Sequence, residues 1–349
     1  MKITIYSLLV FVCTAFSACS TKVDLYADYK DIAVIYGLVD INADTNYLRI
    51  SKAFCGSNDN PINAYEVALI SDSSNYPEKL DAYIIEFQRT LGQQYQATGR
   101  KLLLDTLTIH NKEQGLFYAP DQELYYTTEK FFPSENGNRY KYQLVIVKPN
   151  GDTLKAETTP VGGKVSLLGT LANFQSRPSE ATNKLSFRSS PEGQLYDIKM
   201  QFNYREQHTG QAMTCKHVSW SYGARTLEKY DKVPGTEDVY FMEYSVNTLF
   251  NYLSKAIGSD TIWDTNHPNV VRHIDNFVVT LSVGGHELYE NFLMNSVLNN
   301  GLTTNAFSNI EGEGIGLFSS RTNIVKTMGL TSSTLTDLFG MKAWGFKEE

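Results

Sequence analysis

The chain has 349 residues and a formal net charge of −7, and 12% of its residues are aromatic. Nucleic acids and anionic lipid headgroups are bound by dense cationic surfaces, so the acidic balance and the lack of a basic cluster argue against both as main partners. The length suits two domains of ordinary size, each with its own hydrophobic core.

The first 18 residues are typical of a secretory signal and are set apart from the fold. Lys2 is followed by an apolar run at residues 3–16, which is too short and too weakly flanked for a permanent transmembrane helix. The sequence therefore predicts export, with a signal peptide at residues 1–18 and a polar tether at residues 19–30.

The end of this signal, FSAC at residues 16–19, resembles the bacterial lipobox, in which a bulky apolar residue and two small ones precede an invariant cysteine. The resemblance implies that the Cys19 thiol is joined to diacylglycerol, that the signal is cut before Cys19, and that the new amine is acylated. Each buried methylene contributes about 0.8 kcal/mol, so two or three chains anchor a protein stably. Cys13 is a poorer match, and a soluble protein cut near Ala18 is the alternative.

Residues 31–160 show strand patterns separated by turn signals. The runs IAVIYGLVDI and YLRISKAF flank NADTN and predict a hairpin. Asp40, Asn42 and Asp44 alternate as in a calcium loop, but Thr45 and Ser51 stand where that loop needs glycine and a carboxylate. Because Asx side chains bond to nearby backbone, a turn is favoured over a calcium site.

Further strands are predicted by DAYIIEFQR, whose alternation suggests one buried face, and by KLLLDTLTI. NAYEVALIS reads as a short helix or a connection. The clearest hairpin is YKYQLVIV, KPNG, DTLKAETT, in which an Asn-Gly pair supplies the tight turn. These elements predict an immunoglobulin-like β-sandwich over 31–160, with PVGGK at 160–164 as the domain boundary.

Residues 165–349 mix strands with helices. Strands are predicted at LYDIKMQFNYRE, KHVSWSY, VYFMEY and NFVVTLSV. VNTLFNYLSKAIG has the apolar spacing of a helix, with Ser245 as its N-cap and Gly258 just past its end. ELYENFLMNSVLNNG and residues 332–339 predict two more helices. The protein is thus expected to be mainly β, with a β-rich α+β domain at its C-terminal end.

Catalytic and metal-binding motifs are incomplete throughout. His286 and Glu287 begin like the HExxH zinc signature, but Glu290 occupies the second histidine position. No GxSxG nucleophile elbow occurs. Cys55 and Cys215 could form one disulfide or remain two buried thiols. The sequence predicts no enzyme activity, no cofactor and no metal site.

The stretch NIEGEGIGLFSSR, residues 309–321, has glycines at every second position. A dinucleotide fingerprint needs a third glycine where Leu317 stands, and a P-loop needs Gly-Lys-Ser/Thr. The stretch instead predicts a strand or bulged turn in which glycine lets another chain segment approach closely. Ile315 and Leu317 are expected to pack on one face of it.

Aromatic residues supply the only candidates for ligand binding. Trp220 and Tyr222 lie two apart in SWSY and would share one face of a strand. Exposed aromatic pairs stack on sugars or anchor protein partners. The alternative is that they fill a half-buried face of a sheet, where such residues are common.

The lipobox, the two hairpin sequences and SNIEGEGIGLFSSR together resemble an uncharacterised lipoprotein family of Bacteroidetes, known chiefly as a domain of unknown function. The resemblance implies an outer-membrane or surface-exposed lipoprotein, often encoded beside TonB-dependent receptors. Only Lys22 and Asp24 match the charged residues that accompany surface export, so exposure at the surface and a periplasm-facing orientation both stay open.

We therefore expect a lipid-anchored cell-envelope binding or accessory protein that assists a TonB-dependent type of outer-membrane uptake system through a ligand not identified by the sequence. An anchored hydrolase acting on glycans or peptides is one alternative, with its carboxylates not recognisable as a pair. A structural or adhesive envelope component is the other.

Overall fold

The computed structural model describes residues 31–53, 74–90, 92–110, 121–134, 137–176, 180–257, 270–299 and 307–348. The strands are β1 (Ala33–Val39), β2 (Asn46–Lys52), β3 (Asp81–Arg89), β4 (Gln96–Leu103), β5 (Asp105–Ile109), β6 (Gln122–Thr127), β7 (Arg139–Val147), β8 (Thr153–Thr158), β9 (Ser166–Leu167), β10 (Leu171–Ala172), β11 (Thr182–Arg188), β12 (Leu195–His208), β13 (Thr214–Ser221), β14 (Asp231–Lys232), β15 (Val239–Ser245), β16 (Val270–Gly284) and β17 (Gly314–Leu330). The α-helices are α3 (Thr248–Ile257), α4 (His286–Asn299) and α5 (Ser332–Gly340), and the short 3-10 helices are η2 (Leu227–Lys229) and η4 (Lys342–Trp344). The protein is mainly β, as predicted.

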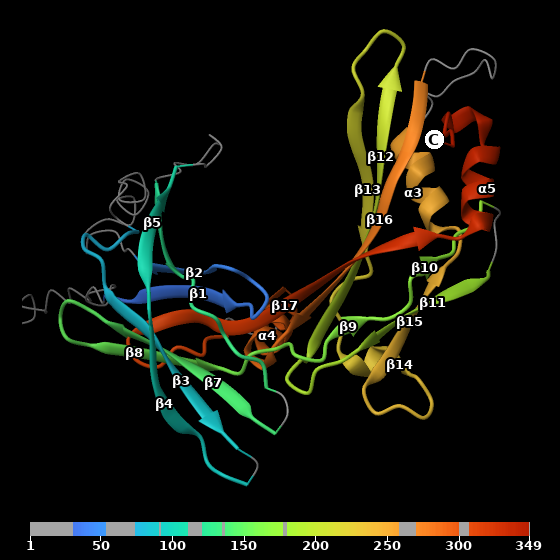
Figure 1. Ribbon diagram of the computed structural model, residues 1–349. Helices are drawn as coiled ribbons and strands as arrows, with labels where there is room; N and C mark the ends of the chain where they lie inside the picture. Colours follow the sequence, from blue (N-terminus) through green and yellow to red (C-terminus); the bar gives the residue numbers. More distant parts are fainter. Residues whose placement is uncertain are drawn as a thin grey trace, which may run out of the picture.

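The elements form two lobes joined by the long strand β17 (Figure 1). In the first lobe, β17, β1, β2, β6 and β5 are neighbours in one sheet, and β4, β3, β7 and β8 form another. Both predicted hairpins are confirmed: β1 pairs antiparallel with β2, and β7 with β8. Gly151 takes the positive φ of 89° that the second hairpin turn requires.

The core of the first lobe lies between its two sheets. Alternate residues of β1 and β2, such as Ile35 and Leu48, meet Ile84 of β3 and Leu144 of β7, and all four are almost fully buried. This burial of apolar side chains from both sheets is the main force holding them together.

Strand β3 has one buried face, as predicted, but this is not the apolar face of Tyr83, Ile85 and Phe87. The opposite face is buried, and it carries a charge. Ala82, Ile84 and Glu86 point into the core, while Tyr83 lies on the half-buried face. A carboxylate thus occupies a core position that the pattern of polarity assigns to an apolar residue.

The second lobe holds the remaining strands and the helices α3 and α5. Its sheets are β13, β12, β16 and β17, with β10 attached to β17, and β14, β15, β11 and β9. Helix α3 buries Leu249, Phe250, Leu253 and Ile257, the face predicted from its spacing. It begins at Thr248, so the prediction of Ser245 as N-cap is wrong: the side chain of Ser245 instead donates to Asn247 Oδ1.

Strand β17 belongs to both lobes. Its residues 314–320 pair in parallel with β1, and its residues 321–328 pair antiparallel with β16. Phe318 is buried in the core of the first lobe and Met328 in that of the second. The region predicted as the first domain, 31–160, therefore shares its sheet with a strand from near the end of the chain.

Several predictions fall on residues outside the described ranges: the signal, Cys19, the tether, NAYEVALIS and Cys55. Cys215 carries a free, exposed thiol on β13, so the expectation that it is buried is wrong. Within the described ranges, no helix has both the length and the apolar character needed to cross a membrane.

Candidate functional site

The glycine-rich stretch at 309–321 runs along β1 as the first part of β17. Gly316 has a φ of 130°, and a Cβ there would overlap the carbonyl oxygen of Ile35 and lie 2.8 Å from its carbonyl carbon. The predicted close approach of another backbone is therefore confirmed. Leu317 is only 6% exposed, whereas Ile315 is 50% exposed, so the prediction that both pack is wrong for Ile315.

Next to this stretch, the outer face of β17, β1 and β2 carries two exposed tyrosines and two arginines. Tyr36 is 56% exposed and Tyr47 is 48% exposed. Tyr36 lies opposite Leu317 on one neighbouring strand and opposite Arg49 on the other. Arg321 is exposed where β17 leaves the first lobe. We call Tyr36, Tyr47, Arg49, Leu317 and Arg321 the tyrosine–arginine face.

A cavity of about 360 Å³ is sunk into this face, lined by Tyr36, Gly37, Leu38, Asp40, Ala43, Thr45, Asn46, Tyr47, Leu317 and Arg321. Its size lies within the range of small-molecule sites. Aromatic rings and a guanidinium on its walls are groups that can stack on a ring and hold an anion.

One wall of the cavity is the turn between β1 and β2, whose Asp40, Asn42 and Asp44 alternate as in a calcium loop. Asp40 Oδ1 accepts hydrogen bonds from Asn42 N at 2.9 Å and from Thr322 Oγ1 at 3.2 Å. Asn42 Nδ2 donates to the same threonine at 2.7 Å, and Asn46 Oδ1 accepts from Asp40 N at 2.6 Å. These side chains close an Asx turn and fasten it to β17, which confirms the turn.

The two arginines of the face lack the carboxylate partners that most other described arginines have. Arg100, Arg188 and Arg272 each form ion pairs with carboxylates. For Arg49 and Arg321, in contrast, the described part of the chain supplies neither an ion pair nor a side-chain hydrogen bond. Their donors are therefore available to a ligand as far as the described residues are concerned.

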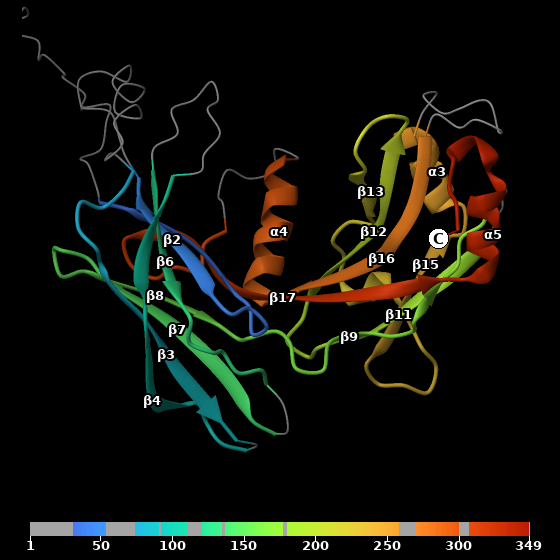
Figure 2. The ribbon, with the colours of Figure 1, turned by 45° about the horizontal axis from the view of Figure 1, so that its top comes forward.

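Helix α4 stands beside the face, over β17 and between the lobes (Figure 2). Ser319 of β17 accepts a hydrogen bond from Leu288 N at 3.0 Å and donates to Glu287 Oε2 at 2.9 Å. Thr158 of β8 donates to the same carboxylate oxygen at 2.8 Å. The glutamate of the incomplete HExxH motif thus ties the first turn of α4 to two strands.

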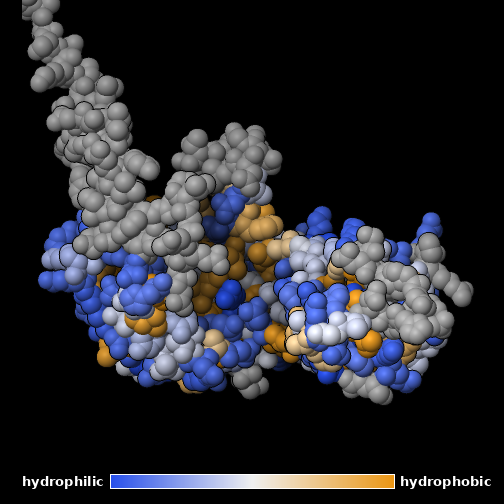
Figure 3. All heavy atoms as spheres, turned by 90° about the horizontal axis from the view of Figure 1, so that it is seen from above, coloured by the Kyte–Doolittle hydropathy of each residue, from blue (hydrophilic) through white to orange (hydrophobic). Residues whose placement is uncertain are grey.

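Apolar surface collects in the hollow between the lobes, next to α4 (Figure 3). Phe292 and Leu293 of α4 are 42% and 37% exposed. The tyrosine–arginine face therefore borders surface that water solvates poorly, which is common for binding sites.

Trp220 and Tyr222, the candidates predicted from the sequence, lie in the second lobe, away from this face. Trp220 is only 5% exposed, and its indole N–H donates to the Tyr222 hydroxyl at 3.2 Å. Its ring stacks on Tyr252 with centroids 5.1 Å apart, and burial raises the pKa of Tyr222. The structure gives Trp220 the packing role that the sequence left open as the alternative.

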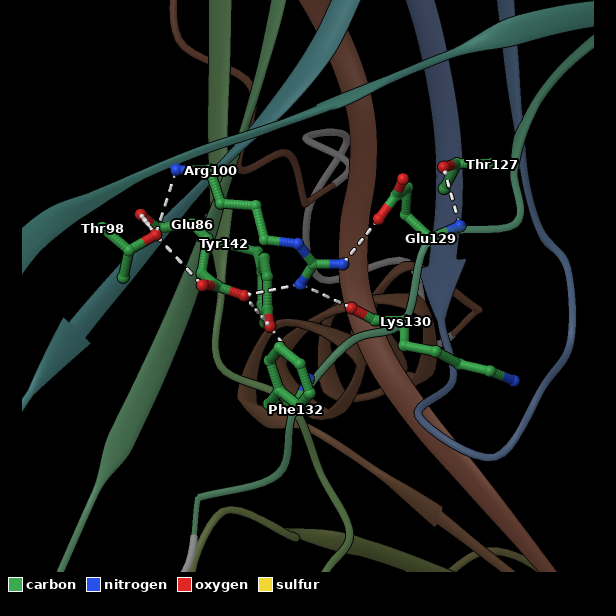
Figure 4. A network of polar contacts seen from close by, with 8 residues as sticks. All are labelled: Glu86, Thr98, Arg100, Thr127, Glu129, Lys130, Phe132 and Tyr142. Carbon is green, nitrogen blue, oxygen red and sulfur yellow. Dashed lines mark hydrogen bonds and ion pairs between the residues drawn. The ribbon is translucent and has the colours of Figure 1, made fainter.

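The polar network around Glu86 is the next candidate (Figure 4). Glu86 is 4% exposed and accepts hydrogen bonds from Tyr142 at 2.8 Å and Arg100 at 2.9 Å through Oε2, and from Thr98 at 3.0 Å through Oε1. Arg100 also donates to Glu129 at 2.7 Å. Arg100 bridges the two carboxylates and compensates one of their two charges, and the Glu86 member is closed off from water.

The pKa shifts of Arg100 and Tyr142 are consistent with a structural role for this network. Burial lowers the pKa of Arg100, but its hydrogen bonds to Glu129 and Glu86 outweigh this effect and raise it. Burial also raises the pKa of Tyr142, which keeps its hydroxyl protonated as a donor to Glu86. Arg100 and Tyr142 are thus both held in the protonated form that their hydrogen bonds to Glu86 require.

A second buried ion pair fastens the end of the chain. Arg272 of β16 is 2% exposed. Its Nε donates to Glu206 Oε2 at 2.8 Å, and its Nη1 donates to the Trp344 carbonyl at 2.8 Å. Its backbone also pairs with residues 345 and 347. This cluster is part of the packing of the second lobe.

No known protein family matches the chain, and no curated protein matches it. The resemblance to a Bacteroidetes lipoprotein family therefore stays a prediction.

Sequence reasoning missed the tyrosine–arginine face. Its signal is the alternation in β1 and β2, where Tyr36 and Tyr47 occupy the positions between buried residues. Arg321 joins them only through the pairing of β17 with β1, which local sequence does not encode.

Proposed function

We propose that this chain is a lipid-anchored cell-envelope binding protein, and that its ligand docks on the tyrosine–arginine face. The observation that carries the proposal is the cavity between Tyr36, Tyr47 and Arg321, because it combines exposed rings with a guanidinium that is unpaired within the described structure. Exposed aromatic side chains cost solubility, and their clustering around a hollow is typical of recognition surfaces.

The scaffold suits such a role. We infer that the first lobe is an immunoglobulin-like sandwich, because two mainly antiparallel sheets share one core and turns connect their strands. The lipobox-like FSAC sequence supports a lipid anchor at Cys19, with a short tether to β1. Such a module would present its ligand to a TonB-dependent type of outer-membrane receptor, the partner implied by the family resemblance.

Crosslinking in intact outer membranes tests this proposal. A photoactivatable residue introduced at Tyr47 should crosslink to ligand or receptor, and the yield should fall at least tenfold when Tyr36 is also changed to alanine. The matched control is the same crosslinker at Tyr252, another exposed tyrosine, but in the second lobe.

Two results would count against the proposal. Equal crosslinking from Tyr47 and Tyr252 would show that the face has no special role. Recovery of no partner, together with turnover of a glycan or peptide by the purified protein, would replace the binding role with that of an anchored hydrolase.

A further inference from the structure

The tyrosine–arginine face also indicates the chemical class of its ligand, an inference that rests on the proposed function. Tyr36 and Tyr47 are about half exposed, and both lie on the same outer face of adjacent antiparallel strands. Tyr47 is backed by Tyr126, with ring centroids 6.3 Å apart. Exposed aromatic rings on neighbouring strands suit a ligand with its own ring faces, such as a saccharide.

The two arginines add a requirement for negative charge. Arg49 is the cross-strand partner of Tyr36, and Arg321 lines the cavity on its β17 side. Neither guanidinium is neutralised by a described carboxylate, although the protein as a whole is acidic. A guanidinium presents paired donors that match the two oxygens of a carboxylate or sulfate group.

Opposing charge at the site is limited. Asp40 lines the cavity, but its Oδ1 already accepts hydrogen bonds from Asn42 and Thr322. The carboxylate of Glu287, on α4, already accepts hydrogen bonds from Ser319 and Thr158. Arg321 and Asp40 lie on the cavity wall, and Arg49 adds a second cation on the strand beside Tyr36. With both guanidiniums unpaired among the described residues, the face as a whole favours an anionic ligand over a neutral or cationic one.

We propose that the tyrosine–arginine face binds an acidic saccharide, in which sugar rings stack on Tyr36 and Tyr47 while carboxylate or sulfate groups pair with Arg49 and Arg321. Neutral saccharides would keep the stacking but leave the guanidiniums without their partners. Non-sugar polyanions would keep the charge pairing but lose the stacking.

Calorimetric titration of the purified full chain with matched polymers tests the assignment. The probes are polygalacturonate and its methyl ester, dextran sulfate and dextran, and polyglutamate as a polyanion without sugar rings. Polygalacturonate or dextran sulfate should bind at least tenfold more tightly than its uncharged counterpart and than polyglutamate. The affinity should fall as salt concentration rises, because charge pairing is screened.

Variants locate the binding on the face. Arg321→Gln and Arg49→Gln should each weaken binding of the acidic polymer about tenfold and reduce its salt dependence, and Tyr36→Ala should weaken it to a similar extent. Lys216→Gln, which removes an exposed cation from β13 in the second lobe, should leave it unchanged. Unchanged melting temperatures would show that the variants remain folded.

The outcomes separate this inference from the proposed function. Polygalacturonate and its methyl ester could bind equally well, with both losing affinity in Tyr36→Ala. That result would overturn the charge requirement but leave the face as a binding site. Equal binding of polyglutamate would overturn the saccharide assignment. Failure of every polymer to bind would also overturn it, while crosslinking from Tyr47 would still decide whether the face binds anything.

Discussion

Phe318 and Met328 lie on the same strand, β17, but each is buried in the core of a different lobe. Parallel pairing of residues 314–320 with β1 places a C-terminal segment inside the sheet of the first lobe. The two lobes are therefore not independent along the chain, and the stability of the first depends on residues far beyond position 160.

A fragment of residues 31–160 should consequently fail to fold on its own. It lacks Phe318 from its core and leaves the edge of β1 without its partner strand, which exposes unpaired backbone groups. Circular dichroism and hydrogen exchange should show a largely unprotected fragment. Addition of a peptide covering residues 307–322 should restore protection in β1, and a stable fragment without the peptide would contradict this dependence.

Substitution of Gly316 should destabilise the protein strongly. In Gly316→Ala, the new Cβ would overlap the backbone of Ile35, and alanine rarely adopts a φ of 130°. Backbone strain of this kind and the forced separation of β17 from β1 should together cost at least about 3 kcal/mol of unfolding free energy. Denaturant titration measures this loss.

The matched control is Gly340→Ala at the end of α5, where a Cβ would meet no atom within 4 Å. Alanine favours helices over glycine by up to about 1 kcal/mol, so this variant should be neutral or slightly more stable. Similar losses for both glycines would mean that close packing on Ile35 is not the cause.

Two glutamates bind Arg100, and replacing the buried one should cost much more unfolding free energy than replacing the exposed one. Glu86→Gln removes the charge from the almost fully buried partner and should cost about 3 kcal/mol, because Arg100 and Tyr142 lose their ionised acceptor. Glu129→Gln removes a partner that is 56% exposed and should cost no more than about 1 kcal/mol. Thermal and denaturant unfolding of both variants test this order, and equal costs would contradict it.

Buried tyrosines predict a loss of stability in alkali. Burial raises the pKa of Tyr230 from 10.0 to about 12, and it also raises the pKa values of Tyr142 and Tyr196. A raised pKa in the folded state means that the stabilisation is complete below pH 10 and declines as pH rises through about 12, since the unfolded chain releases its protons first.

Melting temperature and tyrosinate absorbance, both followed against pH, measure this effect. Tyr230→Phe should lower stability near neutral pH by about 1 kcal/mol, because the hydrogen bond from its hydroxyl to the Tyr196 carbonyl is lost. It should also make the alkaline decline shallower. An unchanged decline would show that Tyr230 does not contribute to it.

Local sequence patterns predict much of this fold. Alternating polarity and an Asn-Gly pair identify the hairpins β1–β2 and β7–β8, and apolar spacing identifies α3 and α4. These signals lie within a few residues of one another. The pairing of β1 with β17 joins segments about 280 residues apart, and nothing in either strand encodes its partner.

The same limit explains the errors at single residues. Polarity places Glu86 on the outer face of β3, but Arg100 and Tyr142 from other strands satisfy its carboxylate inside the core. Conversely, Ile315 has an apolar side chain but remains half exposed, because burial depends on which element covers its strand. Contacts between distant strands decide both cases.

The lipid anchor gives the last prediction. In Cys19→Ala, the thiol that would accept diacylglycerol is absent, so labelling by a fatty-acid analogue should disappear and the protein should leave the membrane fraction. Two or three acyl chains hold a protein at a bilayer, so the loss of all of them should release it. Cys13→Ala, six residues earlier in the predicted signal, should change neither result. Persistent labelling of the Cys19 variant would refute lipidation at this residue, and loss of labelling only in the Cys13 variant would move the anchor to the other cysteine.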